Sequence, residues 1–81
     1  MPPYEARFPK GKSVRIASRS TLEEQRRDWE YHDPITDEHL KHAGTASRIK
    51  SVGFYHGGDV LYTLENLPHL TWHEFSLEPV E

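Results

Sequence analysis

The sequence contains no cysteine, and this absence removes several chemistries at once. The chain has no disulfide framework, no thiolate metal ligand and no cysteine nucleophile. Long apolar runs are lacking too, since none approaches the ~18 residues of a membrane-spanning helix. The start of the chain, residues 1–5, has no apolar segment of the signal-peptide kind. We therefore expect a cytoplasmic protein.

An excess of positive charge is also lacking. Ten Lys and Arg residues are interspersed with thirteen Asp and Glu residues, which gives a net charge of -3. Proteins that bind nucleic acid through its phosphates usually carry a basic patch or stripe. Arg48 and Lys50 near Tyr55 form only a small version of such a patch. Binding of single-stranded nucleic acid therefore stays an alternative rather than the leading hypothesis.

The hydrophobic content is low, at 35% of 81 residues. A chain of this length forms one domain and buries only about 60% of the surface that its unfolded form exposes. The core must therefore be thin, and large aromatic side chains are expected to supply most of the buried area. The predicted aromatic anchors are Trp29, Phe54, Tyr55, Tyr62, Trp72 and Phe75.

Short strands separated by turns predict an all-β fold. Val14 and Ile16 alternate with polar residues, which indicates a half-buried strand. A hairpin is predicted from residues 45–55 and 60–65, joined by a turn at 56–59, and two more strands at 70–72 and 75–77 follow a turn at 66–69. We predict one small SH3-like barrel of about five strands over residues 7–81, preceded by a flexible N-terminal arm at residues 1–6.

A helical excursion, about residues 20–43, is expected between the first and second strands. Ser20 or Thr21 is the predicted cap of a helix that runs from residue 22 to about 31 and ends before Pro34. A second, shorter helix is predicted to start at Thr36 and to stop at Gly44.

Two breaks in strand periodicity predict local distortions of the barrel. Ile49 and Val52 are three positions apart, so strict alternation cannot place both in the core. We infer a β-bulge near residues 51–53. A similar slip between Trp72 and Phe75 predicts a kink there.

Histidine is unusually frequent, with six residues in the chain. His39 and His42 share one face of the second predicted helix, which is a possible start of a zinc site. A third ligand, such as His32 or Asp33, would have to converge from elsewhere. The alternative is that these histidines are solvated or cap a helix, and we assign no metal ligand.

The remaining polar residues do not form a recognisable catalytic arrangement. Every Glu, Asp and His lies in a pattern that predicts exposure, and the serines lack the glycine-flanked context of a nucleophile. Gly57 and Gly58 are not followed by a P-loop lysine, so a hairpin turn is the better interpretation. We assign no catalytic and no cofactor-binding residue.

Three segments together resemble the SH3-like domain of the nitrile hydratase β-subunit family. Residues 7–16 match its entry signature, in which an aromatic residue and a glycine turn precede Val-Arg-hydrophobic. Residues 61–64 resemble its Leu-Tyr-Thr-Val strand. Residues 74–79 resemble its closing Glu-x-x-Leu-Glu segment, although His73 separates this segment from Trp72. The excursion at residues 18–43 has no counterpart that we recognise in the family.

The resemblance implies a separately made, non-catalytic small subunit of a nitrile-hydratase-type enzyme, which hydrates a nitrile to an amide, or of the related thiocyanate-hydrolysing enzyme. In that family cobalt or iron is held by a cysteine cluster on the α-subunit, so the implied partners are an α-type subunit and, where the enzyme is split into three chains, a further β-like chain. The same fold also serves as accessory subunits in electron transport. An arginine that the family places before the glycine opening the second strand is replaced here by Ala43. The alternative is a stand-alone barrel that binds protein or nucleic acid.

Overall fold

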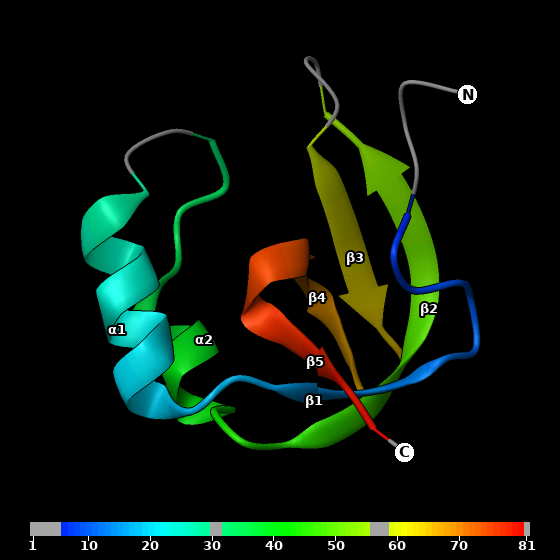
Figure 1. Ribbon diagram of the computed structural model, residues 1–81, viewed down its shortest axis with the longest axis horizontal. Coiled ribbons are helices and arrows are strands. Elements are labelled where there is room, and N and C mark those ends of the chain that lie inside the picture. Colours follow the sequence, from blue (N-terminus) through cyan, green and yellow to red (C-terminus); the bar gives the residue numbers. More distant parts are fainter. Residues whose placement is uncertain (1–5, 30–31, 56–58, 81) are drawn as a thin grey trace.

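The computed structural model describes residues 6–29, 32–55 and 59–80 and is mostly β, as the sequence predicts (Figure 1). Five antiparallel strands form one sheet in the order β4-β3-β2-β1-β5, the curled sheet of a small SH3-like barrel. The strands are β1 (Ser13–Ile16), β2 (Ala46–Phe54), β3 (Val60–Leu64), β4 (Leu67–His73) and β5 (Leu77–Pro79). The predicted hairpin is confirmed as β2 and β3, while most of its turn and residues 1–5 of the predicted arm lie outside the described residues.

Both predicted distortions of the strands are present, at slightly different places. The pairing of β2 with β3 shifts between Ile49 and Ser51, so the bulge falls at Lys50, just before the predicted range. The 3-10 turn η1 (Glu74–Ser76) separates β4 from β5 and makes the predicted kink. The predicted turn at 66–69 is wrong in extent, because β4 already starts at Leu67. Pro68 is tolerated there because β4 is an edge strand, where a missing N–H need not break a ladder bond.

The excursion forms two helices, α1 (Arg19–Asp28) and α2 (Asp37–Lys41), which pack against each other at one side of the sheet (Figure 1). The predicted cap of α1 is wrong, because Ser18 is the N-cap and its hydroxyl accepts the N–H of Thr21 at 3.3 Å. Thr36 caps α2 as predicted. Within the described residues, no helix is long and apolar enough to cross a membrane.

The core is more aliphatic than predicted. Of the six expected aromatic anchors, only Tyr62 and Trp72 are buried, while Trp29 is half-buried. Phe54, Tyr55 and Phe75 are 41–47% exposed, because they lie at the hairpin end of β2 and on η1 rather than on inward-facing strand positions. The other buried hydrophobic residues are Phe8, Val14, Ile16, Ala17, Leu22, Ile35, Leu40, Ile49, Leu64, Leu67 and Leu77.

A buried hydrogen-bond network at Tyr62 joins three distant parts of the chain. The Tyr62 hydroxyl accepts the backbone N–H of Phe8 at 3.1 Å and donates to Glu74 Oε2 at 2.6 Å. The same carboxylate oxygen accepts the N–H of Arg7 at 3.0 Å. Burial, assisted by the Glu74 carboxylate, raises the pKa of Tyr62 to about 12. The three segments that carry the family resemblance therefore meet at one phenol.

Candidate functional site

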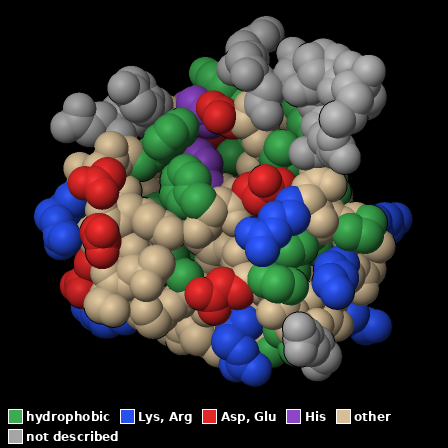
Figure 2. All heavy atoms as spheres, viewed as in Figure 1, with side chains coloured by type: hydrophobic (Ala, Val, Ile, Leu, Met, Phe, Trp, Pro, Cys, Tyr) green, Lys and Arg blue, Asp and Glu red, His purple; other side chains and the backbone are tan. Residues whose placement is uncertain are grey.

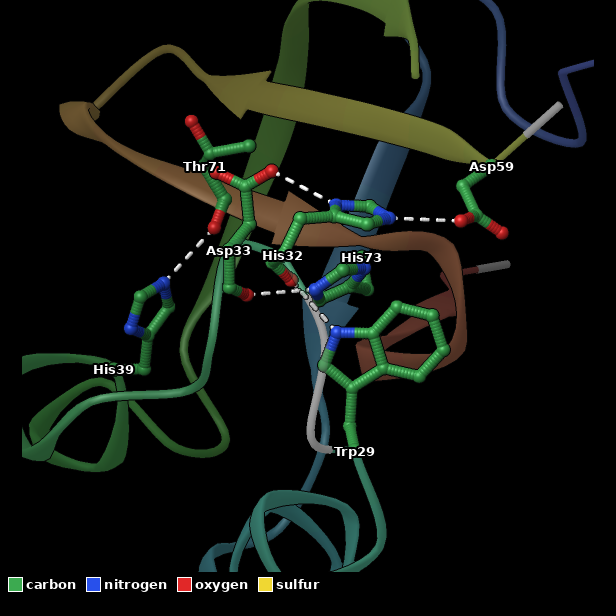
Figure 3. A network of polar contacts seen from close by, with 7 residues as sticks. All are labelled: Trp29, His32, Asp33, His39, Asp59, Thr71 and His73. Carbon is green, nitrogen blue, oxygen red and sulfur yellow. Dashed lines mark hydrogen bonds and ion pairs between the residues drawn. The ribbon is translucent and has the colours of Figure 1, made fainter. Parts of the chain in front are cut away.

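Residues 32 and 33, which lie between the two helices, are held by the side chains of Trp29, the C-cap of α1, and of His73 on β4 (Figure 3). The indole N–H of Trp29 donates to the carbonyl of His32 at 2.7 Å. Nε2 of the buried His73 donates to the carbonyl of Asp33, also at 2.7 Å. Asp33 has a φ of 49°, a left-handed conformation that Asp tolerates better than most residues. These two hydrogen bonds hold the unusual backbone in place.

The His32 ring lies between two carboxylates and stacks on an aromatic ring. Its Nε2 is 2.8 Å from Asp59 Oδ2, and its Nδ1 is 3.0 Å from Asp33 Oδ2. The Tyr55 ring stacks on it at a centroid distance of 3.6 Å. The hydrogen bond that the ring donates to Asp59, followed by the one that it donates to Asp33, raises the pKa of His32. With both ring nitrogens donating to carboxylates, His32 is unsuited to act as a general base or as a metal ligand.

His39 is equally committed to a structural role. Its Nδ1 accepts the backbone N–H of Thr36 at 3.0 Å, and its Nε2 donates to the carbonyl of Thr71 at 2.9 Å. Burial lowers the pKa of His39, in keeping with a neutral ring. Of the two interpretations that the sequence left open, the helix cap is the one that holds for His39. It does not pair with His42 as a ligand.

Two histidines and two serines have structural roles in the fold. The prediction that every histidine is exposed is wrong for His39 and His73, which are buried. The sequence does contain a signal for the structural role of His39. It lies three residues after the Thr36 cap, at the position where Glu or Gln usually completes a capping box. The serine hydroxyls of Ser18 and Ser76 bind a helix N–H and the Gln25 amide, which agrees with their structural interpretation.

Five aromatic rings contact one another in one cluster around the buried His73, which we name the aromatic ridge and define as Tyr55, His32, His73, Trp29 and Phe75. Trp29 has its centroid 5.0 Å from that of His73 and 5.5 Å from that of Phe75. His73 stacks on Phe75, and His32 lies 5.6 Å from His73. Figure 2 shows hydrophobic, histidine and acidic side chains gathered on the upper part of the face in view. Within the aromatic ridge, Tyr55 and Phe75 are the exposed residues, at 41% and 44%.

A shallow hollow of about 160 Å³ opens at the Phe75 end of the ridge, between α1 and η1. It is lined by Gln25, Asp28, Trp29 and Phe75. The Gln25 amide donates to the carbonyl of Phe75 at 2.7 Å, which ties the turn to the helix. The hollow thus has a fixed wall.

No protein family, curated protein or solved structure matches this chain.

The pKa of His32 leads to a test in solution. The pKa of His32 is higher in the folded state than in the unfolded state, so protonation of His32 stabilises the fold. This stabilisation is complete when the pH is below the unfolded-state pKa of about 6.5, and it is lost as the pH rises through the folded-state pKa. The free energy of unfolding of the wild type should therefore exceed that of His32→Gln most near pH 6, and this difference should shrink by pH 8.5. Urea denaturation at each pH measures it. The pKa of His39 is lowered and not raised, so His39 also makes stability depend on pH, in the opposite direction. Both proteins contain His39, and the difference between their free energies of unfolding therefore reports on His32 alone. A difference that is constant or grows with pH contradicts the arrangement.

Proposed function

We propose that this chain is a cytoplasmic, non-catalytic small subunit of a nitrile-hydratase-type metalloenzyme, which docks onto a metal-bearing α-type subunit. The observation that carries the proposal is the aromatic ridge, a cluster of rings that holds the adjacent backbone and exposes Tyr55 and Phe75. The lack of cysteine means that cobalt or iron would be held by the partner and not by this chain.

The ridge has the chemistry of a protein-binding surface. Aromatic residues are enriched in the buried centres of protein interfaces, and they contribute most when they are already held in place before binding. Here Trp29 and His73 each hold a backbone carbonyl of the helix link, so the ridge is largely ordered in the isolated chain. Docking would cover Tyr55 and Phe75 without reorganising the fold.

The family resemblance indicates which kind of partner the chain would bind. The Tyr62 network gives a physical reason for the three matching segments to occur together, because Phe8, Tyr62 and Glu74 depend on one another. This reason concerns the fold, and the identity of the enzyme complex comes from the resemblance alone. The arginine position of the family is occupied by Ala43, so we assign no contact to the partner's metal ligands at that point.

Co-purification tests the proposal. The tagged chain is expressed together with the products of its neighbouring genes, and the eluted proteins are identified and analysed for metal. We expect a protein with a cysteine cluster that carries cobalt or iron to elute with it. Elution of the chain alone, with every neighbouring product present in soluble form, would contradict the proposal.

The second candidate is a stand-alone barrel that binds protein or nucleic acid. Its nucleic-acid form is disfavoured by charge, since Arg48 pairs with Glu65 at 3.2 Å and Asp28, Asp33 and Asp59 lie along the ridge. Filter binding to single-stranded oligonucleotides across a salt series decides this point. Salt-sensitive binding would favour the nucleic-acid form of the alternative, and its absence would remove that form.

A further inference from the structure

Three potential metal ligands from α2 and β4 converge at the side of the molecule. They are Glu38, His42 and His69, whose ligand atoms all lie within 4.8 Å of one another. Glu38 lies on α2, His42 is the C-cap of the same helix four residues later, and His69 reaches them from β4. The sequence singled out His42, but not the two residues that join it.

The distances from Glu38 Oε1 to the two histidine nitrogens are close to those of a zinc site, and all three atoms lie within 4.8 Å of one another. Nε2 of His69 is 3.5 Å from Glu38 Oε1, and Nε2 of His42 is 3.8 Å from the same oxygen. In a tetrahedral site with bonds of about 2.0–2.1 Å, neighbouring ligand atoms are about 3.3–3.4 Å apart. Small side-chain rotations are therefore enough to bring the three atoms around one ion, because the side chains are only partly packed, between 29% and 58% exposed.

The two carboxylate oxygens of Glu38 have different neighbours, and Oε1 is the one that faces the histidines. Lys41 Nζ is 3.5 Å from Glu38 Oε2, the oxygen that neither histidine contacts. The positive charge of Lys41 opposes a bound cation, so its removal provides a control on charge.

We propose that Glu38, His42 and His69 bind a divalent ion of the zinc class through Glu38 Oε1 and the two Nε2 atoms. Two imidazoles and one carboxylate are a three-ligand set that leaves a fourth position for water or for a donor from another chain. Imidazole ligands favour zinc over magnesium or calcium, which prefer oxygen. The ion would join α2 to β4 and so fasten the helical excursion to the barrel. This site is separate from the aromatic ridge and does not depend on the proposed function.

Zinc titration of the whole chain by calorimetry tests the site, with Mg²⁺ as the negative control. We expect one zinc ion per chain, and His42→Ala or His69→Ala should each weaken binding at least about tenfold, since even outer-shell partners are worth about 10–100-fold. Co²⁺ should give the strong visible absorption of a tetrahedral site, and it should be lost in both variants. Circular dichroism verifies that each variant is folded.

Two control variants separate this site from diffuse binding to histidines or to surface charge. His56→Gln also removes one histidine, and it should leave the zinc affinity at the wild-type value. Lys41→Gln should keep or raise that affinity, because it removes a nearby positive charge. The proposal is overturned by the absence of stoichiometric zinc binding, or by equal losses in His56→Gln and in the two ligand variants.

Discussion

Replacing Tyr62 by alanine is expected to lower the free energy of unfolding by about 3–5 kcal/mol, the usual range for removing a large buried ring. Tyr62 is 1% exposed, and its ring packs on Phe8 at a centroid distance of 5.7 Å. The substitution also removes the hydroxyl that joins Phe8 to Glu74. Since small domains are stable by only about 5–15 kcal/mol, this variant should be close to unfolding.

Two further substitutions separate the ring from the network. Tyr62→Phe keeps the ring but leaves the Phe8 N–H without its acceptor, which should cost about 1–3 kcal/mol. Glu74→Gln keeps an oxygen acceptor for the hydroxyl and should cost less than Tyr62→Phe. Urea denaturation gives the three values. A Tyr62→Phe variant as stable as the wild type would show that the network does not stabilise the fold.

The second large effect is expected on binding of the proposed α-type partner. Phe75→Ala and Tyr55→Ala remove the exposed ends of the aromatic ridge, and each should weaken the complex at least about tenfold, as loss of an aromatic hot spot does. Affinity is measured by calorimetry with the co-purified partner. Both variants should remain folded, because neither side chain belongs to the buried core.

Phe54→Ala is the matched control for this binding experiment. Phe54 is 47% exposed, which is similar to Phe75, but it is not part of the ridge. We expect it to change the affinity by less than the two ridge variants. If all three variants lose affinity equally, or if none does, the ridge is not the docking surface.

The strands were predictable because their signals are local. The alternation of Val14 and Ile16 and the phase slip after Ile49 depend only on neighbours in sequence, and each predicted a feature that is present. The cap of α2 was equally visible, because Thr36 precedes acidic residues. The cap of α1 was misplaced because three hydroxyl residues, Ser18, Ser20 and Thr21, compete within four positions.

The candidate sites were less predictable because they depend on contacts across the fold. His32 meets Asp59, which is 27 residues away, and His73 meets the Asp33 carbonyl 40 residues away. Likewise, the place of His69 beside Glu38 follows from the packing of α2 on β4 and not from spacing. The exposure of Phe75 was missed because a 3-10 turn replaces the expected strand.

Reconstitution tests whether this chain acts by docking onto its proposed partner and not by catalysis of its own. Hydration of a simple nitrile to its amide is assayed with the purified chain, with the purified partner and with the two combined. We expect no turnover by the chain alone, and a higher rate for the combination than for the partner. Turnover by the isolated chain, or a partner whose rate and stability do not change when the chain is added, would contradict the account.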